Sequence, residues 1–84
     1  MSKPPRPDSA PDFTHRGWQV CLDVTPAPSE SDSGVYLCTA WYRPGAGAPW
    51  QVLERRHQSL HFSLKAAREG AQARLRARLE KLAS

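Results

Sequence analysis

Three histidines and two cysteines are the residues of this 84-residue sequence whose side chains could ligate a metal ion or attack a substrate. His57 and His61 stand four positions apart, a spacing that places two ligands on one face of a helix, but we predict extended chain there. The cysteine spacing is not of a metal-binding type, and the sequence has no P-loop, GxGxxG or GxSxG motif. We therefore predict that the chain is not an enzyme and has no catalytic residue, metal site or cofactor.

The two cysteines suggest a register for the first predicted hairpin. If that hairpin folds symmetrically about residues 29 and 30, Val24 faces Val35 and Cys21 falls opposite Cys38. Directly opposed strand residues are close enough for a disulfide or a redox switch. In a reducing compartment the simpler interpretation is two small, partly buried thiols.

Basic residues are concentrated in the second half of the chain. Residues 1–42 carry three basic and five acidic side chains, net −2, whereas residues 43–84 carry nine basic and three acidic, net +6. A basic half of this kind is compatible with binding an anionic partner. Trp50 or Tyr42 beside it could stack on nucleic-acid bases. A solvated helix face has the same composition, because arginine is a good helix former. A nucleic-acid-binding surface is predicted to consist of Arg55, Arg56, Lys65, Arg68 and Arg76.

Aromatic residues are numerous for so small a domain. One face of the second predicted strand is formed by Tyr36, Cys38, Ala40 and Tyr42. A single helix covers one face of a sheet, so this stripe is expected on the open face, where apolar patches often mark a partner surface. We predict a protein interface there, extended by Trp50 and used by a homodimer or by another protein. Packing of the same side chains in the core is the alternative.

A helix over residues 63–82 is the element that must position these groups. Ser63 is a suitable N-cap, and Phe62 before it is placed to act as a hydrophobic staple. Steps of three and four residues put one apolar stripe on the helix, formed by Leu64, Ala67, Ala71, Leu75, Leu79 and Leu82.

Three strands are predicted upstream, at residues 18–25, 35–42 and 50–57. Period-two alternation is clear in the first, and the second is apolar on both faces. The polar stretch 26–34 and the RPGAGAP turn at 43–49 separate them. Residues 1–15 are rich in proline and are predicted to be a disordered tail before a single domain at 16–84. The order β-β-β-α indicates an α+β fold, a three-stranded antiparallel meander with one C-terminal helix on one face.

Two resemblances agree with this layout. The stretch HFSLKAAREGAQARL (61–75), after three strands, resembles small bacterial β-β-β-α proteins of unknown function, which implies a fold for residues 17–82 but no activity. The helix start also resembles that of double-stranded RNA-binding domains, in Ser63, Lys65, Ala66, Ala67, Arg68 and Ala71. This second likeness implies that basic side chains touch phosphates across a groove.

The sequence has no apolar run of membrane-spanning length, and residues 1–11 lack the apolar core of a signal peptide, so we expect a cytoplasmic location and no membrane partner. The function predicted from these observations is that of a small non-enzymatic protein acting by protein association, as a homodimer or with a protein partner. The alternative is a nucleic-acid-binding module, with RNA as the expected ligand. No small-molecule substrate is indicated.

Overall fold

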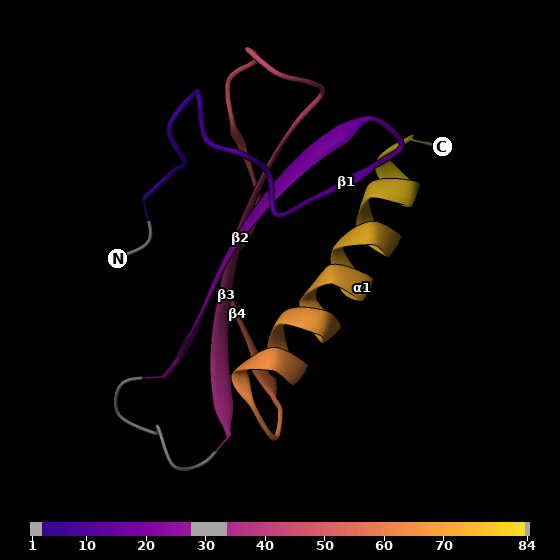
Figure 1. The fold of residues 1–84 in the computed structure, drawn as a ribbon. Helices are drawn as coiled ribbons and strands as arrows, with labels where there is room; N and C mark the ends of the chain where they lie inside the picture. The colour runs from indigo at the N-terminus through magenta and orange to yellow at the C-terminus, as the bar shows by residue number, and fades with distance from the viewer. Residues whose placement is uncertain (1–2, 28–33, 84) are drawn as a thin grey trace.

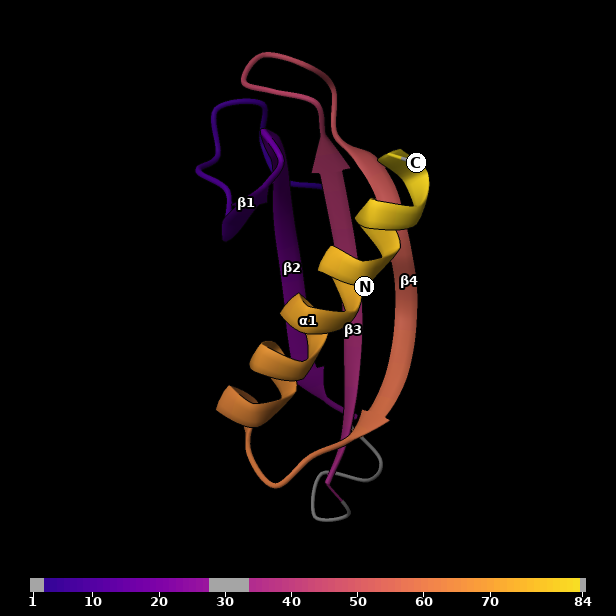
Figure 2. The same ribbon diagram turned by 90° about the vertical axis from the view of Figure 1, so that its right-hand side faces the viewer.

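The computed structural model describes residues 3–27 and 34–83, which form a four-stranded antiparallel sheet and one helix. The strands are β1 (Phe13–His15), β2 (Trp18–Pro26), β3 (Val35–Arg43) and β4 (Gln51–Leu60), and the helix is α1 (Leu64–Ala83). Each strand pairs with its neighbour in the sequence, and α1 crosses one face of the sheet (Figures 1 and 2). The α+β class, the antiparallel meander and the C-terminal helix are confirmed. Most of the predicted polar connection, residues 28–33, lies outside the described chain.

The prediction of three strands is wrong, because β1 forms within the segment expected to be a disordered tail. Arg16 and Gly17 have φ angles of 52° and 83°, and the paired residues His15 and Trp18 flank them. Two consecutive positive φ angles define the two-residue hairpin turn that matches strand twist. Phe13 packs against the core and fixes the short strand to it.

The register predicted for the first hairpin is also wrong. Val24 pairs with Cys38, three residues from the expected Val35, and Cys21 pairs with Trp41. An odd shift turns the other face of a strand inward. The prediction assumed a symmetric loop. Because β3 is apolar on both faces, its sequence pattern does not determine which face is buried, and so it does not determine the register. Cys38 belongs to the core under α1, whereas Cys21 lies on the opposite face, and both are free thiols.

The core lies between α1 and one face of the sheet. The helix contributes Ala67, Ala71, Leu75 and Leu79, at steps of four residues. The sheet contributes Val20, Leu22, Val24, Cys38, Ala40 and Leu53. The two alanines add little bulk and let the helix lie close to the strands. Ser63 caps the helix as predicted, because its Oγ accepts a hydrogen bond from the Ala66 N–H at 3.1 Å.

Two leucines of α1 provide a test of this packing. Leu75 is 0% exposed and Leu82 is 53% exposed. We expect Leu75→Ala to lower the free energy of unfolding by about 2–5 kcal/mol, because it removes buried apolar surface and leaves a cavity. Leu82→Ala, the same change on the same helix, should cost less than about 1 kcal/mol. Urea denaturation followed by circular dichroism measures both, and equal losses would contradict the packing.

Candidate interaction surfaces

The sheet face away from α1 carries a polar clamp centred on Arg43, which is 3% exposed. Its guanidinium donates to Gln19 Oε1 at 2.7 Å, to the Pro7 carbonyl at 2.7 Å and to the Ser9 carbonyl at 3.3 Å. It also lies over the Trp50 ring, 4.1 Å from the centroid, which is a cation–π contact. Arg43 therefore binds the N-terminal segment to the sheet.

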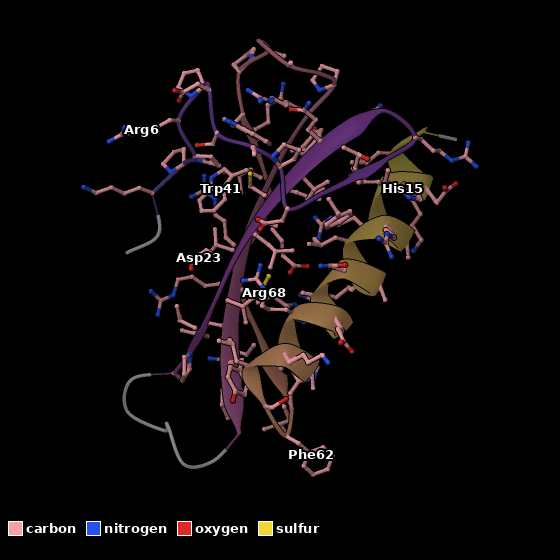
Figure 3. The ribbon with its side chains drawn as sticks, viewed as in Figure 1. Arg6, His15, Asp23, Trp41, Phe62 and Arg68 are labelled. Carbon is pink, nitrogen blue, oxygen red and sulfur yellow. The ribbon has the colours of Figure 1, made fainter. Side chains whose placement is uncertain are left out.

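Trp50 completes this arrangement, which we call the Arg43–Trp50 clamp. Its indole Nε1 donates to the Arg6 carbonyl at 3.0 Å. Arg6 and Trp41 lie on the side of the sheet opposite α1 (Figure 3). Further along the segment, Asp12 Oδ2 accepts a hydrogen bond from the Leu22 N–H at 2.8 Å. The segment that its composition predicts to be disordered is thus held by hydrogen bonds from β2, β3 and the β3–β4 turn.

The predicted interface stripe does not lie on an open face. Cys38 and Ala40 are buried beneath α1, and Tyr36 and Tyr42 pack against the same core. The Tyr42 ring stacks on Trp18 with centroids 5.3 Å apart. The predicted placement of these four residues is wrong, because the β2–β3 register turns them toward the helix. Trp50, the fifth predicted interface residue, lies instead in the Arg43–Trp50 clamp.

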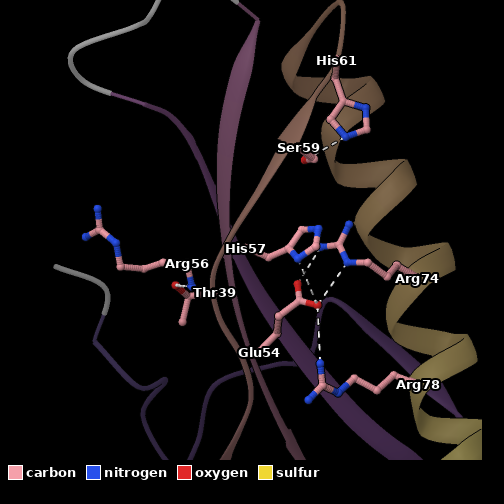
Figure 4. Close-up of polar contacts among 8 residues, drawn as sticks. All are labelled: Thr39, Glu54, Arg56, His57, Ser59, His61, Arg74 and Arg78. Carbon is pink, nitrogen blue, oxygen red and sulfur yellow. Dashed lines mark hydrogen bonds and ion pairs between the residues drawn. The ribbon is translucent and has the colours of Figure 1, made fainter.

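The five predicted nucleic-acid-binding residues are not gathered on one surface. Arg68 pairs with Asp12 at 3.2 Å, and the guanidinium of Arg76 lies 4.9 Å from the Phe13 ring centroid. Those two side chains hold the helix to the N-terminal hairpin. Lys65 is exposed on the first turn of α1, and Arg55 and Arg56 are exposed on β4. Arg56 extends from the side of β4 that faces away from Arg74 (Figure 4).

A buried carboxylate that the sequence patterns did not reveal joins β4 to the other flank of α1. Glu54 Oε1 and Oε2 accept two hydrogen bonds from Arg74, at 2.6 and 3.1 Å, and Arg78 lies 3.9 Å away (Figure 4). His57 Nδ1 lies 4.0 Å from the same carboxylate. The hydrogen bonds that Arg74 donates to the Glu54 carboxylate raise the pKa of Arg74. The spacing of Arg74 and Arg78, one helical turn apart, was the available signal.

This ion-pair cluster also affects the thiol of Cys38. Burial, and secondarily the negative charge of Glu54, raise the pKa of Cys38 to about 11. A thiol with that pKa remains protonated at neutral pH and is a poor nucleophile. In the described part of the chain, no group of three or more histidine, cysteine, aspartate or glutamate side chains is placed to hold a metal ion.

Three apolar side chains are exposed where β4 turns into α1. Leu60 is 73% exposed, Phe62 is 104% exposed and Leu64 is 45% exposed. We call these three residues the β4–α1 corner. The ring of Phe62 projects away from the domain (Figure 3), so the predicted hydrophobic staple is wrong. A fully exposed phenylalanine beside two exposed leucines can contribute hydrophobic free energy only by contacting another surface.

Comparison of the chain with protein-family models, with curated proteins and with solved structures finds no match in any of the three. The helix α1 is not apolar enough to cross a membrane.

Glu54 allows a test of the ion-pair cluster. Glu54→Gln keeps the shape of the side chain but leaves the partly buried Arg74 without its counter-charge, so we expect a loss of about 2 kcal/mol in unfolding free energy. Glu80→Gln is the matched control, because Glu80 pairs with His15 and Arg16 at the surface, where such pairs contribute little. Urea denaturation at neutral pH should show a clear loss for the first variant only. Equal stability of the two variants would contradict the structural role of the cluster.

Proposed function

We propose that this chain is a non-enzymatic protein that acts by association, and that two copies pair through the β4–α1 corner. The observation that carries the proposal is the complete exposure of Phe62, with Leu60 and Leu64 beside it. Aromatic side chains are enriched in protein interfaces relative to the rest of the surface, so a fully exposed phenylalanine is a candidate contact residue.

A second copy is the partner favoured by the charges next to the corner. Lys65 and Glu69 are both exposed on the first two turns of α1. In a two-fold arrangement the same patch meets itself, so a lysine of one copy can lie opposite a glutamate of the other. Three side chains expose less apolar area than the roughly 800 Å² per partner of a stable interface, so we expect a weak, reversible dimer.

Pairing of two copies through the edge of β4 is less favourable. The β3–β4 register shifts twice, next to Ala40, and Arg56 has a positive φ of 44°. Bulges and charged residues at an edge are features that prevent strand addition. Two β4 edges placed side by side would also bring Arg55 and Arg56 of each copy close to those of the other.

Phe62→Ser is the test of this proposal. Sedimentation velocity over a wide range of protein concentration should show the parent chain shifting from monomer to dimer, and the variant remaining monomeric. Leu82→Ser is the matched control, since it removes an exposed apolar side chain at the far end of α1. It should leave the association unchanged. A parent chain that stays monomeric at every concentration contradicts the proposal, as does a Phe62→Ser variant that still dimerises.

Nucleic-acid binding is the second candidate, favoured by a concavity of about 430 Å³ lined by Arg74, Ala77, Arg78 and Lys81. If duplex RNA binds there, Arg78→Ala with Lys81→Ala should reduce the slope of log affinity against log salt by about 2. Arg55→Ala with Arg56→Ala removes the same charge from β4 and should leave that slope unchanged. Titrations at low and moderate salt measure it, and salt-independent or undetectable binding by the parent chain eliminates this candidate.

A further inference from the structure

The N-terminal segment lies against the β3–β4 turn. A cleft of about 370 Å³ is lined on one side by Pro4, Pro5 and Pro7, and on the other by residues 47–50, which include Pro49 and Trp50. The indole N–H of Trp50 donates to the Arg6 carbonyl, within this run of prolines, at 3.0 Å. Trp50 therefore lines a cleft together with these prolines and donates a hydrogen bond to the same short segment.

This combination fits the chemistry of a proline-rich segment. Proline has no backbone N–H, so the carbonyl groups of such a segment are left free to accept, and domains that recognise proline-rich chains use aromatic side chains against the proline rings. Residues 4–7, Pro-Pro-Arg-Pro, have prolines at the first and fourth positions, the PxxP spacing of such ligands. Residues 6–9 form a turn, in which the Ser9 N–H donates to the Arg6 carbonyl at 3.0 Å and the Arg6 N–H donates to Ser9 Oγ at 3.1 Å. The hydrogen bonds from the clamp reach the carbonyl oxygens of Arg6, Pro7 and Ser9 that this turn presents.

We propose that the Arg43–Trp50 clamp is a binding site for a proline-rich segment of another protein, and that residues 3–9 occupy it as an intramolecular competitor. The site is independent of the β4–α1 corner, because the two lie at opposite ends of β4. The proposal does not require that two copies of the chain pair.

Arg43 makes exchange of one segment for another more favourable than an empty site. Its buried guanidinium requires acceptors, and an unsatisfied buried donor is costly. A second proline-rich segment replaces the lost carbonyl groups, so the hydrogen bonds of Arg43 are conserved. The chain's own segment has the advantage of being tethered, which gives it an effective concentration in the millimolar range. Weakening that segment should therefore increase the apparent affinity for a peptide added in solution.

The test uses the full chain with Pro4, Pro5 and Pro7 changed to glycine (P4G/P5G/P7G), which keeps the backbone carbonyls but removes the stiffness of the segment. The probe is a peptide of residues 3–11, and the readout is the Trp50 indole N–H resonance, assigned with Trp50→Phe. All samples carry Phe62→Ser so that association at the corner does not contribute. We expect the peptide to shift this resonance in both chains, at a concentration about tenfold lower in the glycine variant.

The control is a matched peptide in which glycine replaces Pro4, Pro5 and Pro7. It keeps the same charges and should produce no shift of the Trp50 resonance. An equal response to both peptides overturns the proposal, because recognition then depends on charge. So does an unmoved Trp50 resonance in the glycine variant at millimolar peptide, if the amide spectrum is that of a folded protein. If the glycine variant does not fold, the parent chain at millimolar peptide gives the same readout, and the absence of a saturable shift overturns the proposal.

Discussion

The buried guanidinium of Arg43 connects three segments that are distant in the sequence. It donates to Gln19 of β2 and to the carbonyl groups of Pro7 and Ser9, and it lies against the ring of Trp50 after the β3–β4 turn. Burying a cation without acceptors costs more than a small domain can readily offset. The N-terminal segment and β2 must therefore be in place for this end of the sheet to close. The composition of the N-terminal segment favours disorder. The segment is ordered because its carbonyl groups accept hydrogen bonds from the buried Arg43 guanidinium.

Among the residues that the structure describes, a single helix covers one of the two faces of the sheet. The helix packs on one face through alanine and leucine side chains, and polar contacts hold both of its flanks: Arg68 to Asp12 on the side of β1, and Arg74 to Glu54 on the side of β4. Much of the positive charge that makes the second half of the sequence resemble a nucleic-acid-binding surface is engaged in these contacts. Net charge is thus a poor guide to a ligand surface when the arginines are also the groups that dock the helix.

The elements with one clear pattern could be predicted from the sequence, namely the Ser63 cap, the alternation of β2 and the part of the helix stripe between Ala67 and Leu79. The predicted ends of that stripe were wrong, because Leu64 and Leu82 are exposed. The register could not, because β3 is apolar on both faces and a long loop does not determine pairing. The hairpin turn at Arg16 and Gly17 was not predicted, because β1 has only three residues and Gly17 is the only turn residue that marks it. The sequence indicated one of the two residues of the Arg43–Trp50 clamp. It predicts Trp50 as an interface residue, but it places Arg43 at the start of a polar turn, where an exposed side chain is expected. Its burial is a property of the tertiary structure.

The geometry of β4 explains why the two candidate association surfaces lie at its ends. The middle of the strand is bulged, carries Arg55 and Arg56, and is poorly suited to pair with another strand. Its start is covered by the N-terminal segment through Trp50, and its end leads into the exposed ring of Phe62. Since the two surfaces lie at opposite ends of the ten-residue strand β4, a partner at one end does not sterically block the other. Two copies joined at the corner would present two clamps, and a partner with two proline-rich segments would then bind the pair more tightly than either copy alone.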